Sequence, residues 1–135
     1  MIKTTLMNVF KHTLKIIILL TIVLGCTTNS EISQEEERIE LDNLKDEIEQ
    51  LISTGTCSEN TNCDFIAFGS KPCGGPWSYL VYSTSINVDL LKEKVAVYNE
   101  NETTFNIKWG AISDCMAVMP PVNVDCIDGT CTAIY

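Results

Sequence analysis

The sequence predicts a small α+β domain that is stabilised by disulfides and contains two helices, a mostly antiparallel sheet and a C-terminal β-hairpin. Three observations support this fold class: two stretches with helical periodicity, short β-rich stretches between and after them, and seven cysteines in a chain of 135 residues. A domain of this size has a modest core, and small exported domains commonly add disulfides to it.

The first predicted helix spans residues 33–53 and is acidic. Ser33-Gln34-Glu35-Glu36 has the S-x-x-E form of a helix capping box. An apolar stripe recurs every three or four positions, at Leu41, Leu44, Ile48 and Leu51, and acidic residues occupy most other positions. We expect the stripe to dock on a cysteine-rich α+β domain at residues 57–135; the alternative is that the acidic surface binds a partner.

Two strands and a second helix are predicted next. Cys63–Gly69 and Trp77–Ser83 are apolar and aromatic enough for strands, and the loop sequence KPCGGPW joins them. Asn87 can cap a helix whose stripe is Val88, Leu91, Val95 and Tyr98. Residues 102–109 fit either an extension of this helix to about Gly110 or a strand, and we favour the helix.

The C-terminal part is predicted to be β-structure. Cys115–Val122 is expected to form a strand that Pro120-Pro121 ends or bends. Residues 122–135 are expected to form a hairpin, because Asp128-Gly129 favours a two-residue type I′ turn. This register pairs Ile127 with Thr130 and places Cys126 opposite Cys131, within disulfide reach.

Six cysteines are expected to form three disulfides: Cys57, Cys63, Cys73, Cys115, Cys126 and Cys131. The hairpin register predicts Cys126 with Cys131. For the other four cysteines, the simplest arrangement pairs Cys57 with Cys63 and Cys73 with Cys115. An arrangement that pairs Cys57 with Cys73 and Cys63 with Cys115 stays open. In the chain-entropy model the Cys73–Cys115 loop contributes about 4 kcal/mol and each short loop a little over 2.

Residue composition argues against several classes of function. The one histidine, His12, lies near the amino terminus, and no Cys-x-x-Cys occurs, so we expect no catalytic residues, no metal site, no cofactor and no enzyme activity. Without residues 1–25, six basic residues remain against eighteen acidic ones, a formal charge of −12. Nucleic acid is therefore not an expected partner.

The amino terminus has the layout of a signal peptide. Lys3, Lys11 and Lys15 precede an apolar run, residues 16–25, that is about 15 Å long as a helix and so spans half a bilayer. Val23-Leu24-Gly25-Cys26 resembles the lipobox of bacterial lipoproteins.

This resemblance implies cleavage of a signal peptide, residues 1–25, and attachment of lipid such as palmitate to Cys26. Residues 26–32 would be the lipid anchor and tether, and the mature protein would be held at a membrane of the bacterial cell envelope. Thr27 after the cysteine favours the outer membrane by enteric sorting rules, and the leaflet stays open.

Cys57 to Cys131, with CGGPW and Ser113-Asp114-Cys115, resembles small uncharacterised cysteine-rich domains of secreted bacterial proteins, which imply no particular activity. Our first hypothesis is a non-enzymatic binding module that presents Lys71, Pro72 and Trp77, with Tyr79 beside them, to a protein or glycan. One form of it is an inhibitor of a hydrolase. The alternative is a structural or assembly lipoprotein that uses the acidic helix.

Overall fold

The computed structural model describes residues 32–58 and 61–135. The predicted signal peptide, the lipid anchor at Cys26 and nearly all of the tether lie outside these residues. Within the described part of the chain, no helix is long and apolar enough to cross a membrane.

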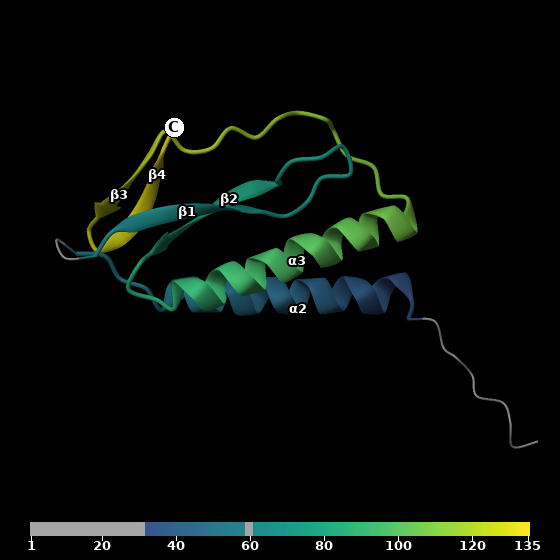
Figure 1. The fold of residues 1–135 in the computed structure, drawn as a ribbon, viewed down its shortest axis with the longest axis horizontal. Coiled ribbons are helices and arrows are strands. Elements are labelled where there is room, and N and C mark those ends of the chain that lie inside the picture. The colour runs from purple at the N-terminus through teal and green to yellow at the C-terminus, as the bar shows by residue number, and fades with distance from the viewer. Residues whose placement is uncertain (1–31, 59–60) are drawn as a thin grey trace, which may run out of the picture. The chain divides into compact units, whose positions relative to one another are not determined.

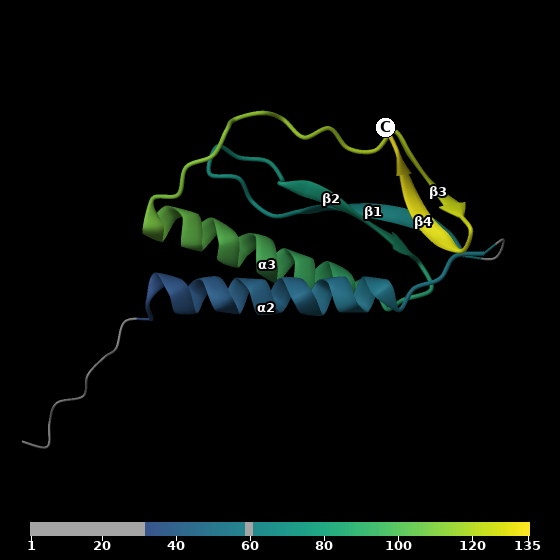
Figure 2. The ribbon, with the colours of Figure 1, turned by 180° about the vertical axis from the view of Figure 1, so that it is seen from behind.

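Two helices form one layer of the domain and lie side by side in opposite directions (Figures 1 and 2). Helix α2 spans Gln34–Ser53 and begins with the predicted capping box, in which the Ser33 hydroxyl accepts the Glu36 N–H and the Glu36 carboxylate accepts the Ser33 N–H. Helix α3 spans Val88–Trp109 and ends at Gly110, whose left-handed conformation (φ 61°) suits glycine. The helical interpretation of residues 102–109 is therefore confirmed.

The second layer is a two-stranded antiparallel sheet over the helices. Strand β1, Cys63–Phe68, pairs with strand β2, Ser78–Ser83, in a register that sets Cys63 opposite Ser83. Both predicted strands are confirmed. The core lies between the layers and consists of buried side chains from α2, α3 and the sheet: Leu41, Ile48, Phe68, Tyr82, Leu91, Val95, Tyr98 and Phe105. The Phe68 and Tyr98 rings stack at 4.4 Å and join the two layers.

The C-terminal hairpin forms a second two-stranded sheet that contacts β1 and β2. Strand β3 spans Asn123–Ile127 and strand β4 spans Thr130–Ile134. Asp128 and Gly129 both have positive φ, 51° and 79°, as a type I′ turn requires. Cys126 lies opposite Cys131 and Ile127 opposite Thr130, so the predicted turn and register are confirmed.

The predicted strand at Cys115–Val122 is wrong. Residues 111–122, here called the strap, contain no strand and run from the end of α3 to β3 (Figure 1). Pro120 and Pro121 have no N–H to donate to a ladder, and the strap is instead attached through side chains, at Lys71 and at a disulfide. Its apolar side chains are exposed, at Ile112, Met116, Met119 and Val122.

Two of the predicted disulfides are also wrong. Cys57 pairs with Cys126 and Cys63 with Cys131, at Cα separations of 5.8 and 5.5 Å, while Cys73 pairs with Cys115 as the simplest arrangement predicted. Cys126 and Cys131 do face each other across the hairpin, but both also face the segment that enters β1, where Cys57 and Cys63 lie. The Cys57 N–H donates to the Gly129 carbonyl at 3.1 Å and brings this segment to the hairpin turn.

Candidate functional site

The KPCGGPW segment is the tight connection between β1 and β2. The Gly74 N–H donates to the Lys71 carbonyl and the Lys71 N–H donates to the Gly75 carbonyl, both at 2.8 Å. Pro72 occupies the second position of this turn, and Gly74 and Gly75 both have positive φ (92° and 82°), which glycine adopts without strain. The Trp77 N–H donates to the Phe68 carbonyl at 3.0 Å and continues the ladder into β2.

Helix α3 binds the base of this loop through polar side chains at helical spacing. Asn99 accepts the Gly69 N–H at 2.7 Å, and Glu102 accepts the Ser70 N–H at 2.5 Å. The Asn106 amide donates to the Ser70 carbonyl at 2.7 Å. The backbone of residues 69–70 is thus hydrogen-bonded to three side chains on one face of the helix, which fixes the direction of the loop that follows.

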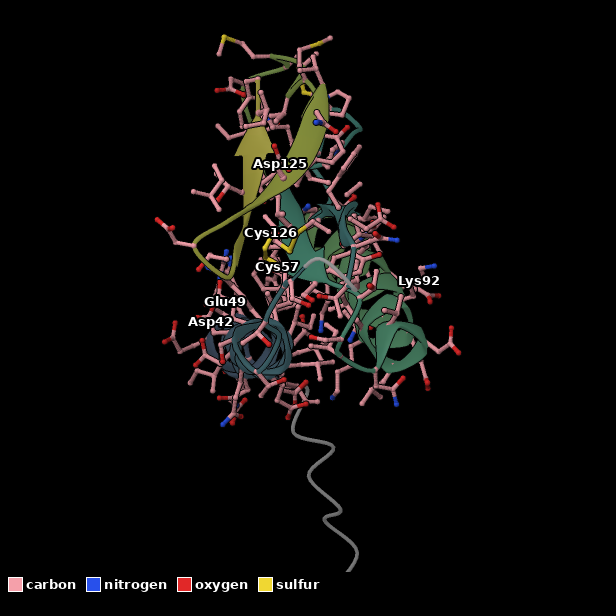
Figure 3. All side chains as sticks on the ribbon, turned by 90° about the vertical axis from the view of Figure 1, so that its left-hand side faces the viewer. Asp42, Glu49, Cys57, Lys92, Asp125 and Cys126 are labelled. Carbon is pink, nitrogen blue, oxygen red and sulfur yellow. A yellow bond between two sulfur atoms is a disulfide. The ribbon has the colours of Figure 1, made fainter. Side chains whose placement is uncertain are left out.

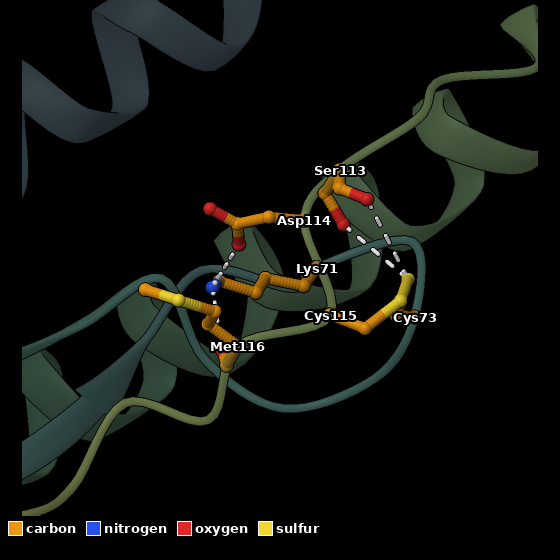
Figure 4. Close-up of polar contacts among 6 residues, drawn as sticks. All are labelled: Lys71, Cys73, Ser113, Asp114, Cys115 and Met116. Atoms are coloured by element: carbon orange, nitrogen blue, oxygen red, sulfur yellow. Dashed lines mark hydrogen bonds and ion pairs between the residues drawn. A yellow bond between two sulfur atoms is a disulfide. The ribbon is translucent and has the colours of Figure 1, made fainter.

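Lys71 is buried, so the expectation that this residue is presented at the loop surface is wrong. Its ammonium group donates to the Asp114 carboxylate at 2.9 Å and to the Met116 carbonyl at 2.8 Å (Figure 4). It also lies 5.1 Å from the centre of the Trp77 ring, within cation–π range. The ion pair holds the pKa of Asp114 below its usual value. Lys71 therefore connects the loop, the strap and Trp77.

The disulfide between Cys73 and Cys115 adds a covalent connection at the same place. The hydroxyl oxygen of Ser113, beside this bridge, lies 3.6 Å from the Cys73 sulfur (Figure 4). The strap is thus attached to the loop at three consecutive residues, at Asp114 and Met116 by the lysine and at Cys115 by the bridge. A loop that is held in this way loses little conformational entropy when it binds a ligand.

Pro72 and Trp77 remain exposed and line an open groove of about 450 Å³, here called the aromatic groove. The groove lies between α2, α3 and the edge of the β1–β2 sheet, and its aromatic and apolar lining includes Phe68, Trp77, Leu80 and Tyr98. Trp77 is 42% exposed, which is high for a tryptophan. A second hollow of about 450 Å³ shares Pro72, Asn106 and Ala111 with the aromatic groove, so Pro72 stands at the boundary between the two.

The polar lining of the aromatic groove contains both positively and negatively charged side chains. Arg38, Lys45 and Glu49 come from α2, and Glu102 comes from α3. Burial raises the pKa of the Glu102 carboxyl, and hydrogen bonds from Ser70, Trp77 and Tyr98 together with the charge of Arg38 oppose that shift. Burial and then the nearby Glu102 charge raise the pKa of Tyr98 to about 12. The Glu102 carboxylate is thus occupied by groups of the protein itself, and the charged groups that a ligand can reach beside the exposed aromatic ring include the Arg38 guanidinium and the Glu49 carboxylate.

Glu49 and Glu102 are the two carboxylates of this groove. Glu49 is largely exposed and pairs with Lys45 at 3.7 Å, whereas Glu102 is bound to the loop backbone. Both therefore have structural partners. The sequence did not predict Arg38, Tyr98 or Glu102 as site residues. The predicted helix over residues 102–109 does place Asn99, Glu102 and Asn106 on one face, and this spacing was the available signal for Glu102.

A cluster of sulfur atoms lies near the C-terminal hairpin, away from this groove. The Sγ atoms of Cys57, Cys63 and Cys131 all lie within 4.8 Å of one another, and Cys126 is bonded to Cys57 (Figure 3). Among the described residues, this is the arrangement that could hold a metal ion if its thiols were free.

Comparison of the chain with protein-family models, with curated proteins and with solved structures finds no match.

Proposed function

We propose that this chain is a membrane-anchored envelope lipoprotein whose folded domain is a non-enzymatic binding module with the aromatic groove as its ligand site. One observation carries the proposal: Trp77 is a large exposed aromatic side chain on a loop that α3, Lys71 and a disulfide all hold in place. Exposed tryptophans on rigid supports are typical centres of binding energy, because their burial removes a large apolar surface from water at little entropic cost.

The composition of the groove supports a ligand with both apolar and hydrogen-bonding parts, such as a glycan or a loop of a protein. The aromatic ring offers a flat apolar surface, while Arg38 and the exposed Glu49 offer a donor and an acceptor. One form of this function is inhibition of a hydrolase. It is supported by the exposed acidic residues of α2, at Glu35, Glu40, Asp42 and Asp46, which favour association with a basic enzyme.

These same acidic residues favour the second candidate function, a structural or assembly lipoprotein that binds its partner through α2. Four acids of this helix already have partners within the chain: Glu36 caps the helix at Ser33, and Glu37, Glu47 and Glu49 bind Lys108, Lys94 and Lys45. The others face solvent and leave a negative surface for a partner.

Affinity capture with the full chain tests the groove. The chain is used to capture partners from envelope extract and host secretions, and Trp77→Ala is compared with Met119→Ala, which removes a 70% exposed side chain from the strap. We expect Trp77→Ala to lose the captured ligand and Met119→Ala to keep it. Equal capture by both variants would overturn the groove as the site. Chemical conversion of a captured glycan would contradict the non-enzymatic assignment.

A charge-neutral helix separates the two candidate functions. The triple variant Glu40→Gln, Asp42→Asn, Asp46→Asn keeps the apolar stripe of α2 and removes three exposed charges. Loss of the partner in this variant, with capture retained in Trp77→Ala, would favour the assembly function.

Metabolic labelling tests the anchor independently of the groove. We expect radioactive palmitate to label the wild-type chain and not a Cys26→Ser chain, and we expect the labelled protein in the outer-membrane fraction. A Cys26→Ser chain that still incorporates label would rule out the proposed lipid site.

A further inference from the structure

The sulfur cluster at the C-terminal hairpin unites residues that are far apart in the sequence. Cys57 and Cys63 lie before and at the start of β1, whereas Cys126 and Cys131 lie on β3 and β4. Their bridges span 69 and 68 positions, yet the sulfur atoms of Cys57, Cys63 and Cys131 are within 4.8 Å of one another. The two bridges are therefore neighbours in one cluster of four sulfur atoms.

Backbone contacts bring these four residues together. Cys126 and Cys131 are opposite one another in the hairpin register, so their side chains leave the same face of the β3–β4 sheet. The Cys57 N–H donates to the Gly129 carbonyl at 3.1 Å, which places Cys57 at the hairpin turn. Strand β1 contacts both strands of the hairpin and carries Cys63 to the same place.

The sulfur atoms are near enough to converge on one metal ion, but in this structure they are bonded in pairs. A tetrahedral zinc ion binds thiolates at about 2.3 Å, so its sulfur ligands lie roughly 3.8 Å apart. To reach this spacing, the two bridges would move closer together and the bonded sulfur atoms would move apart. Both changes would be small side-chain movements. Local sequence spacing, Cys-x5-Cys and Cys-x4-Cys, gave no zinc motif, because the ligand pairs are completed by the fold rather than by a short loop.

We propose that Cys57, Cys63, Cys126 and Cys131 form a binding site for one zinc ion when both bridges are reduced. With a phosphine as reductant, each bridge takes up two electrons and two protons and gives two thiols, and the phosphine becomes its oxide with the oxygen of one water molecule. The ion then displaces four thiol protons and binds four thiolates. The reduced state is the one in which a newly made chain exists before it reaches an oxidising compartment.

The third disulfide supplies a matched control. Cys73 and Cys115 connect the β1–β2 loop to the strap and do not belong to the cluster. A full-length chain with Cys26→Ser, Cys73→Ser and Cys115→Ser keeps only the four cysteines of the cluster, and it is reduced with the phosphine before metal is added.

Titration with cobalt(II) and displacement by zinc measure the site directly. We expect one cobalt ion per chain, with the visible absorption of tetrahedral thiolate coordination, and full displacement by one zinc ion. A further Cys131→Ser or Cys63→Ser substitution should weaken binding by at least about tenfold, the lower end of what even an outer-shell partner of a metal site costs. A metal stoichiometry other than one, or an affinity unchanged by either substitution, would overturn the proposal.

Far-ultraviolet circular dichroism of the same samples tests whether the site belongs to this fold. Zinc should restore or maintain the helical signal of the reduced chain, because metal binding contributes directly to folding. Binding of zinc by a chain that stays unfolded would show that the cysteines act as independent thiols, and would also overturn the proposal.

Discussion

The carboxylate of Glu37 accepts the indole N–H of Trp109 at 2.6 Å and joins the first turn of α2 to the last residue of α3. The neighbouring Lys108 binds the other oxygen of the same carboxylate at 2.5 Å. The antiparallel helices are thus connected at this end by one acid with two partners, and at the other end Lys94 binds Glu47 at 2.6 Å.

This arrangement predicts a contribution to stability that depends on pH. The hydrogen bonds from Lys108 and then Trp109 lower the pKa of Glu37 in the folded chain. The stabilisation is therefore present at neutral pH and is lost as the pH falls through the folded-state pKa. Glu37→Gln should be less stable than wild type at neutral pH, and the difference should vanish in acid. Urea unfolding at several pH values measures it, with Glu40→Gln as an exposed control that changes the net charge equally.

Because the ammonium group of Lys71 is buried and hydrogen-bonded, we expect removal of this side chain to lower the stability of the fold. Lys71→Ala leaves the Met116 carbonyl without its donor, removes the cation paired with Asp114 and leaves space beside Trp77, so we expect a loss of about 1–3 kcal/mol in the free energy of unfolding. Lys45→Ala, which removes an exposed pair with Glu49, should cost about 0.3–0.5 kcal/mol. Equal losses in chemical denaturation would mean that the Lys71 contacts contribute little.

Gly69 predicts a steric effect on the position of Trp77. A Cβ atom at Gly69 would lie 2.6 Å from the Trp77 ring and 3.0 Å from the Glu102 carboxylate, whereas at Gly75, which has the same φ of 82°, nothing lies within 4 Å. Gly75→Ala should therefore cost only the backbone conformation, about 1–2 kcal/mol. Gly69→Ala should cost roughly 1–3 kcal/mol more, and it should shift the fluorescence of Trp77. A smaller loss for Gly69→Ala than for Gly75→Ala would contradict the packing described.

The disulfide pattern predicts a specific set of linked fragments. Cleavage after acidic residues cuts at Glu59, between Cys57 and Cys63, and at Asp128, between Cys126 and Cys131. Mass spectrometry without reduction should find the Cys57 fragment linked to the Cys126 fragment and the Cys63 fragment linked to the Cys131 fragment. The digest is kept acidic, because neighbouring bridges exchange readily once a thiolate is present. A fragment that links Cys126 to Cys131 would refute this connectivity.

The helices and the hairpin could be predicted from the sequence because their signals are local. Ser33 and Glu36 form the capping box that their spacing indicated, and Asp128-Gly129 forms the turn that this dipeptide favours. The same hairpin shows where local reasoning fails. Cys126 and Cys131 have the predicted register, but their bonding depends on Cys57 and Cys63, which only the tertiary fold brings near.

The candidate site was predicted only in part for a similar reason. The exposed Trp77 and Pro72 lie in a loop that its composition made conspicuous. The inward direction of Lys71 depends on Asp114 and Met116, more than forty positions later in a strap that has no regular structure. Arg38 and Glu102 come from two helices that share the groove only after the core has formed.

The connectivity of the bridges determines how the domain carries mechanical load. A force applied between residue 32 and Tyr135 passes along α2 to Cys57, crosses the disulfide to Cys126 and leaves through β4. The intervening chain, including β1, β2, α3 and the strap, is enclosed within this covalent shortcut and cannot be stretched by such a force. Tension would therefore peel α2 away first, and it would leave the KPCGGPW loop in its bridged shape until the disulfides themselves were broken.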